Sequence, residues 1–119
     1  MELSPRKALN RFMKGLEAIN TEQEESTKAF FNLLGAVYSH NGTVTVKIKE
    51  LISVGIAVYN RCEYCIVYHV YKALEAGASR QEILESGMVA VAFGGGPSMA
   101  YASTLLRSCV DEFEGDFQG

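Results

Sequence analysis

Apolar residues recur along most of this chain at intervals of three and four positions, which is the period of an α-helix. The clearest stripe consists of Ile48, Leu51, Ile52, Gly55, Ile56 and Tyr59. It predicts a helix that begins near Thr43–Thr45. Val44 and Val46 alternate with polar residues and leave a strand start open, but this alternation is too short to be favoured over the helix.

Polar residues at a characteristic spacing predict where other helices begin. In a capping box, the N-cap side chain and a glutamate three residues later bond the free backbone N–H groups of the first turn. The chain has this spacing at Thr21 and Glu24, at Asn60 and Glu63, and at Ser79 and Glu82, although Asn60 can instead end the helix before it. We expect the first of these helices to run to about Ser39, and an earlier helix to cover roughly residues 5–19.

Glycine, asparagine and proline predict where the helices end, because they favour backbone that cannot continue a helix. Such breaks occur at His40-Asn41-Gly42, at Gly77 and at Gly94-Gly95-Gly96-Pro97. The residues expected to be buried in the later helices are Ile66, Val67, Val70, Tyr71, Leu74, Ala102, Leu105, Leu106, Cys109, Val110 and Phe113. The polar tail from Glu114 is expected to fray. The whole pattern predicts an all-α bundle of about five to six helices in a single domain, residues 1–119.

Composition narrows the class of protein. The chain has 119 residues, of which 48% are hydrophobic, and this suits one domain with a core of limited size. Assembly into a homo-oligomer would bury further apolar surface. The formal net charge is −3 and no basic patch is visible, so we expect no nucleic-acid partner.

The chain also lacks the sequence features of export and membrane insertion. Its first residues do not form the apolar stretch of a signal peptide, and no apolar run approaches the ~18–20 residues that span a bilayer. Its three cysteines do not form the framework of a secreted disulfide-rich domain. We therefore expect a cytoplasmic protein with no membrane partner, in which a Cys-x-x-Cys pair is more often catalytic or metal-binding than a permanent crosslink.

Four residues between positions 50 and 69 carry the candidate chemistry. Cys62 and Cys65 form a Cys-x-x-Cys pair, His69 follows four residues later, and Glu50 precedes Cys62 by twelve. Only a thiolate attacks a peroxide or a disulfide, so a nearby base must remove the thiol proton. A second thiol can then close the oxidised sulfur into a disulfide.

A helix beginning at this motif would bring its parts together. If Asn60 caps that helix, Cys62 lies in the first turn, where the helix dipole favours a thiolate. Cys65 and His69 follow on the same face at one-turn intervals. Glu50 belongs to the preceding helix and faces this row only if the two helices pack as a hairpin, where it could serve as a base.

The segment from Lys49-Glu50-Leu51 through Asn60–His69, continued by Ala73, Ala76-Gly77 and Glu82-Ile83, resembles the core of the carboxymuconolactone decarboxylase superfamily. More narrowly it resembles the alkylhydroperoxidase D-like (AhpD-like) branch, whose pattern is Glu, eleven residues, Cys-x-x-Cys, three residues and His. The resemblance covers about residues 29–112. A lone Cys-x-x-Cys would be weak evidence, but the correctly spaced Glu and His make the pattern specific.

The resemblance implies an AhpD-like helical bundle with the Cys-x-x-Cys at the N-terminus of a central helix, assembled into trimers or hexamers. It implies a peroxidase or disulfide reductase that needs no cofactor, reduces a hydroperoxide and takes electrons from a lipoylated protein or another dithiol donor. Cys65 then resembles the attacking thiol and Cys62 its disulfide partner, whereas the dipole argument favours Cys62 as the more acidic thiol. Glu50 and His69 resemble a proton relay that acts through a water.

Other readings of the same residues stay open. Cys62, Cys65 and His69 could bind zinc with Glu50 as a fourth ligand in a non-catalytic assembly module, although ligands in a row along one helix suit tetrahedral coordination poorly. A lyase that decarboxylates a small lactone acid would keep its activity without both cysteines, since the decarboxylases of this superfamily do not depend on the Cys-x-x-Cys. Three tyrosines near the motif are expected to be packing residues and not catalysts: Tyr64, Tyr68 and Tyr71.

Overall fold

Helices account for nearly all of residues 3–118, the part of the chain that the computed structural model describes. Their bounds are α1 Pro5–Glu22, α2 Glu24–Tyr38, α3 Val46–Asn60, α4 Glu63–Glu75, α5 Arg80–Gly94, α6 Gly96–Tyr101, a π-helical turn η1 Ala102–Leu106, α7 Arg107–Phe113 and a 3₁₀ turn η2 Glu114–Phe117. Because α6, η1 and α7 follow each other without a loop, they form the last helical segment that the sequence predicts. No strand occurs within residues 3–118, so the all-α prediction is confirmed.

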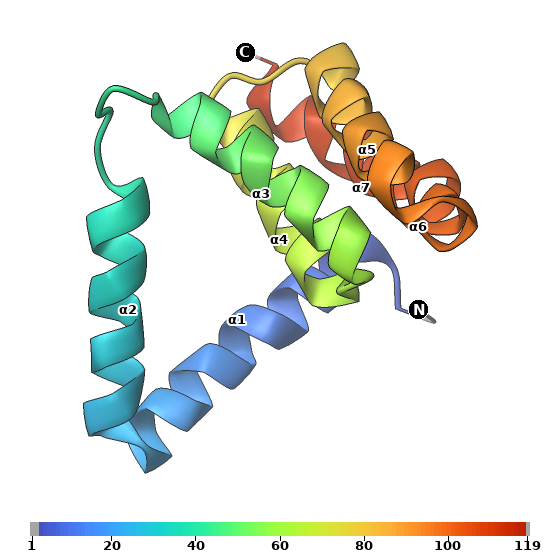
Figure 1. Ribbon diagram of the computed structural model, residues 1–119. Helices are drawn as coiled ribbons and strands as arrows, with labels where there is room; N and C mark the ends of the chain where they lie inside the picture. The colour runs from blue at the N-terminus through green and yellow to red at the C-terminus, as the bar shows by residue number, and fades with distance from the viewer. Residues whose placement is uncertain (1–2, 119) are drawn as a thin grey trace.

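The helices form a body and an arm (Figure 1). In the body, α3 packs against α4 and α5, and α4 also contacts α1, α7 and η1. The core between them is built mainly from aliphatic residues of α3 and α4, together with Ile83, Leu106, Val110 and Phe113. Helices α1 and α2 form the arm, in which α1 leaves the body beneath α4 and α2 stands apart from the body until the loop into α3 (Figure 1).

Two predicted helix starts in the body are confirmed, and one in the arm is wrong. Thr45 caps α3, and Ser79 and Glu82 form the capping box of α5. The expected start of a helix at Thr21 is wrong, because Thr21 lies inside α1 and its hydroxyl donates a hydrogen bond to the Glu17 carbonyl. Gln23 separates α1 from α2 and makes no capping bond through its side chain.

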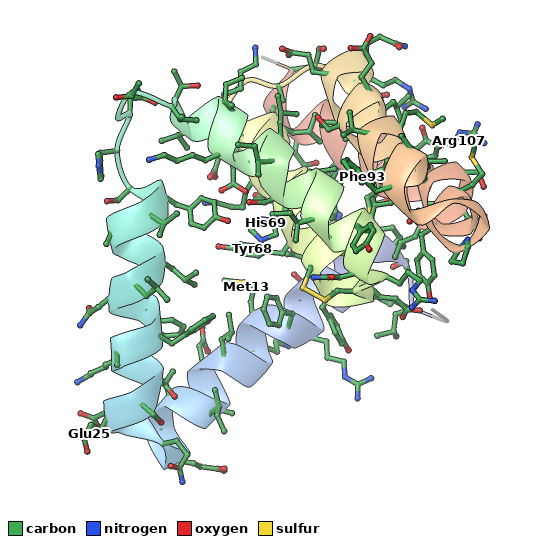
Figure 2. All side chains as sticks on the ribbon, viewed as in Figure 1. Met13, Glu25, Tyr68, His69, Phe93 and Arg107 are labelled. Atoms are coloured by element: carbon green, nitrogen blue, oxygen red, sulfur yellow. A yellow bond between two sulfur atoms is a disulfide. The ribbon has the colours of Figure 1, made fainter. Side chains whose placement is uncertain are left out.

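The apolar stripe that predicts α3 lies on the outer face of the body. Ile52 and Ile56 are 53% and 56% exposed, whereas Val54 and Val58 beside them in sequence are fully buried. With α5, the stripe lines an apolar groove of about 610 Å³. Its far wall includes Phe93, which at 81% is the most exposed large apolar side chain within residues 3–118. Figure 2 shows Phe93 on the body, away from the arm.

The C-terminal segment is held more firmly than its polarity predicts. Phe117 packs edge-on against Tyr71 at a ring-centroid distance of 5.0 Å, and Arg6 of α1 pairs with Glu112 and Asp116. The expected fraying from Glu114 is therefore wrong as far as Phe117, because an aromatic anchor and a charged pair tie this turn to α4 and α1.

Candidate active site

The site begins where α3 ends and α4 starts. Arg61 adopts left-handed backbone with φ of 55°, and its N–H and that of Cys62 bond carbonyls of the last turn of α3. Cys62 is consequently the N-cap of α4, and its sulfur accepts a hydrogen bond from the Cys65 N–H at 3.3 Å. Of the two roles that the sequence offers Asn60, the structure shows the first: Asn60 is the last residue of α3 and does not cap α4. Cys62 still lies at the positive end of the α4 dipole.

The two cysteines of the motif are joined to each other. Cys62 and Cys65 form a disulfide with their Cα atoms 5.2 Å apart. The remaining cysteine, Cys109, is fully buried in α7, and burial raises the pKa of its thiol to about 12. Cys109 is therefore a core residue, as its position on the apolar face predicts, and Cys62 and Cys65 are the only cysteines that lie in the motif.

Glu50 and His69 meet across the α3–α4 interface. The Glu50 Oε1 atom lies 2.7 Å from His69 Nδ1, and Glu50 is only 2% exposed. An ionised carboxylate accepts a hydrogen bond from Nδ1–H, which leaves Nε2 of a neutral imidazole as a proton acceptor. The predicted placement of Glu50 beside His69 is confirmed, and the reason is the packing of α3 on α4.

A cavity of about 810 Å³ lies between the arm and the body. Glu50, Cys65 and His69 line it from the body, and Cys62 does not. The arm contributes an apolar wall from α1 and α2 that consists of Phe12, Met13, Leu16, Phe30, Phe31 and Leu34. Figure 2 shows the labelled Met13, Tyr68 and His69 gathered in this space. The structure thus brings one sulfur of the pair, the carboxylate and the imidazole to a single cavity that faces an apolar wall.

Two tyrosine rings flank His69. Tyr38 of α2 lies 5.7 Å from the imidazole and Tyr68 of α4 lies 5.2 Å from it in an edge-on arrangement. The Tyr38 hydroxyl lies 2.5 Å from the Ser53 hydroxyl, which donates its own proton to the Lys49 carbonyl at 2.8 Å. Tyr38 must therefore donate to Ser53, and this bond ties the end of α2 to the buried face of α3.

These neighbours of His69 differ in how far the sequence could reveal them. Tyr68 stands three residues after Cys65, so helical spacing alone places it on the same face as the thiol. Tyr38 and Ser53 lie on other helices, and no sequence signal brings them to His69.

The arm also contributes Asn20 of α1 to the lining of the cavity. The Oδ1 atom of Asn20 is buried and has no hydrogen-bond partner among the described residues.

Within residues 3–118, no three His, Cys, Asp or Glu side chains are grouped as a metal site requires. None of the described helices combines the length and the apolar character needed to cross a bilayer.

Comparison with known proteins places this geometry in a family. Residues 24–108 match the carboxymuconolactone decarboxylase family. The chain is 33% identical over 89 residues to an uncharacterized protein of Cupriavidus necator, which covers 75% of this chain and 78% of that protein. It is also 33% identical over 87 residues to uncharacterized protein 4 in the cox locus of Paracoccus denitrificans, covering 73% and 77% of the two chains.

Solved structures agree. A carboxymuconolactone decarboxylase family protein from Legionella pneumophila, in its apo form, superposes with a TM-score of 0.85 at 32% identity and covers 92% of this chain and 96% of that one. A Thermotoga maritima member of the family superposes with a TM-score of 0.70 at 31% identity, covering 91% and 97%. The predicted fold is confirmed on both grounds, and the chain belongs to the carboxymuconolactone decarboxylase family.

Proposed function

We propose that this protein is a thiol-dependent oxidoreductase that reduces hydroperoxides through a Cys62–Cys65 dithiol/disulfide cycle. The observation that carries the proposal is the cavity into which Cys65, Glu50 and His69 open together, with the imidazole already bonded to the carboxylate. The Thermotoga maritima relative has been suggested to take part in an antioxidative response, which is in keeping with this activity.

In the reduced protein, the Cys65 thiol gives its proton to His69 Nε2, directly or through one water. Glu50 stabilises the imidazolium that forms, because its carboxylate accepts the Nδ1–H bond. The Cys65 thiolate then attacks the terminal oxygen of the hydroperoxide, so that an S–O bond forms and the O–O bond breaks. The sulfur becomes a sulfenic acid, and the alkoxide that leaves recovers the proton as an alcohol.

Cys62 completes the oxidative half of the cycle. Its thiolate displaces hydroxide from the sulfenic acid, the hydroxide takes up a proton as water, and the disulfide seen in the structure results. A dithiol or lipoylated-protein donor then reduces the disulfide by thiol exchange and becomes a disulfide itself.

The division of labour between the cysteines follows from access. Cys65 lines the cavity, whereas Cys62 does not. The position of Cys62 at the N-cap, where backbone N–H groups stabilise a thiolate, instead suits a resolving thiol that must be ionised to attack the sulfenic acid.

Assembly is part of the proposal. The groove between α3 and α5 exposes large apolar side chains, among them Ile52, Ile56, Val89 and Phe93. A continuous apolar surface of this kind is unusual on a monomer and typical of a subunit interface. We therefore expect a homo-oligomer, a trimer or a hexamer by the family resemblance.

The test follows single turnover of the reduced protein with one equivalent of cumene hydroperoxide by intact-mass spectrometry. Wild-type protein should lose two hydrogens as the disulfide forms. Cys62→Ser should consume peroxide and stop as a sulfenic acid at Cys65, whereas Cys65→Ser should not react. Cys109→Ala serves as the control and should behave as wild type. If Cys65→Ser reacts at the wild-type rate, the proposal is wrong; zinc bound to the parent or decarboxylase activity that survives in the double Cys62/Cys65 variant would favour the other readings.

A further inference from the structure

Tyr68 is a tyrosine of the site whose hydroxyl has no structural task. Its ring is held edge-on by His69 at 5.2 Å and by Phe12 of α1 at 5.7 Å. Its hydroxyl makes no hydrogen bond to any residue that the structure describes. Three other tyrosines differ from it: Tyr38 bonds Ser53, while Tyr64 and Tyr71 do not line the cavity.

The hydroxyl of Tyr68 opens on the same cavity as the thiol. Tyr68 lines the cavity together with Cys65 and His69, and Figure 2 shows its side chain directed from α4 toward α2. Residues at i, i+3 and i+4 share a helix face, which places the Tyr68 ring and the His69 ring on the turn that follows Cys65. A hydroperoxide that reaches Cys65 through this cavity enters the space that these two rings line.

The phenol keeps its proton in this environment. The pKa of Tyr68 is raised above its usual value, mainly by burial; Lys72 acts in the opposite direction, and the Glu50 and Glu75 carboxylates add to the increase. A protonated phenol donates a hydrogen bond, and it can stabilise negative charge that develops on an oxygen nearby.

Resting on the function proposed above, we propose that Tyr68 is a catalytic residue whose hydroxyl donates a hydrogen bond to the leaving oxygen of the hydroperoxide. When the O–O bond breaks, the alkoxide bears the charge that the thiolate brought in. Tyr68 stabilises that charge without transferring its own proton, and the alkoxide is then protonated from His69. Tyr68 thus acts on the leaving oxygen, whereas Glu50 and His69 activate the thiol.

This division predicts which reactions depend on the hydroxyl. Alkylation of Cys65 by iodoacetamide needs a thiolate and releases iodide, so it needs no donor to an oxygen. An alkyl hydroperoxide releases a strongly basic alkoxide and needs the donor most. A peroxycarboxylic acid releases a carboxylate, a weak base that gains little from a donor.

The experiment compares the reduced Cys62→Ser protein with the same protein carrying Tyr68→Phe as well. In both proteins each reaction stops after one step at Cys65. Tyr68→Phe should react ~10- to 100-fold more slowly with cumene hydroperoxide, the usual loss for one hydrogen bond to a developing charge. With peracetic acid it should react within about threefold of the Cys62→Ser protein, and the pH profile of its alkylation by iodoacetamide should be unchanged. Tyr64→Phe removes a hydroxyl from a ring that also contacts Phe12 and should change none of the three rates.

Each other outcome decides against a different statement. If Tyr68→Phe slows all three reactions together, Tyr68 only supports the thiolate or the fold, and the donor role is wrong. Equal rates for Tyr68→Phe and wild type with cumene hydroperoxide also overturn it, while leaving the proposed function intact. A Cys62→Ser parent that is alkylated but oxidised by neither peroxide would instead overturn the proposed function itself.

Discussion

Cys109 provides a quantitative test of whether the reactive thiols are confined to the motif. Burial raises the pKa of its thiol from 9.0 to about 12, and each unit lowers the thiolate fraction tenfold. At pH 8 the thiolate of Cys109 in the folded protein should therefore be ~1,000-fold scarcer than that of the same cysteine in an unfolded chain. Because its side chain is fully buried, alkylation also requires the core to open.

The assay is a pulse of iodoacetamide at pH 8 on the reduced protein, quenched over seconds to hours and read by peptide mass mapping. Cys62 and Cys65 should be modified early, and Cys109 should follow at least ~1,000-fold more slowly than it does in the presence of denaturant. Modification of all three cysteines at one rate in the folded protein would refute the reasoning, because the thiol at position 109 would then be neither buried nor protonated.

The same shift sets a pH dependence of stability. The Cys109 thiol has a higher pKa in the folded than in the unfolded chain, so its contribution is complete below pH 9 and is lost as the pH rises toward 12. The full loss corresponds to about 4 kcal/mol at ~1.4 kcal/mol per unit. Urea denaturation between pH 7 and 11 should show this decline, and Cys109→Val should reduce it; an unchanged slope in that variant would contradict the assignment. Tyr68, whose pKa is also raised by burial, adds a loss of the same sign above its usual pKa.

Three further predictions concern the relay, the surface and the packing. Glu50→Gln and His69→Asn should move the pH profile of Cys65 alkylation to higher pH and lower reactivity at neutral pH by ~10- to 100-fold, with the helical circular dichroism unchanged; profiles that coincide with wild type would remove both residues from the relay. Phe93→Asp replaces the most exposed apolar side chain of the groove by a charged one and should yield a smaller species by light scattering, whereas Glu85→Gln on the same helix should not. Wild-type protein that sediments as a monomer would refute the assembly proposal. Gly87→Ala should destabilise the fold by about 1–3 kcal/mol in urea denaturation, because its new Cβ atom would collide with the Leu106 side chain, while Gly15→Ala on α1 has open space and should not; equal stability would mean that the π-helical turn yields freely.

The sequence determined the helical fold and the local geometry of the motif, because both rest on interactions between residues close in sequence. Helical period, the Ser79–Glu82 capping box and the Gly77 break each predict a feature that the structure contains. The one-turn spacing of Cys62 and Cys65 likewise sets their Cα atoms 5.2 Å apart, within reach of a disulfide. Where two local signals competed, as at Thr21 and Asn60, the continuing backbone hydrogen bonds of the preceding helix decided the boundary.

Tertiary structure alone decided what surrounds the thiols. The packing of α3 on α4 buries Glu50 against His69, and the arm carries Tyr38 and an apolar wall to the same place from residues far away in sequence. Periodicity could not show that the most regular apolar stripe, on α3, faces outward. Two faces of α3 carry apolar residues, and the sequence pattern is the same whichever face the other helices bury. A spacing fixes which residues share a helix face, whereas which face meets which depends on contacts between helices that no local pattern encodes.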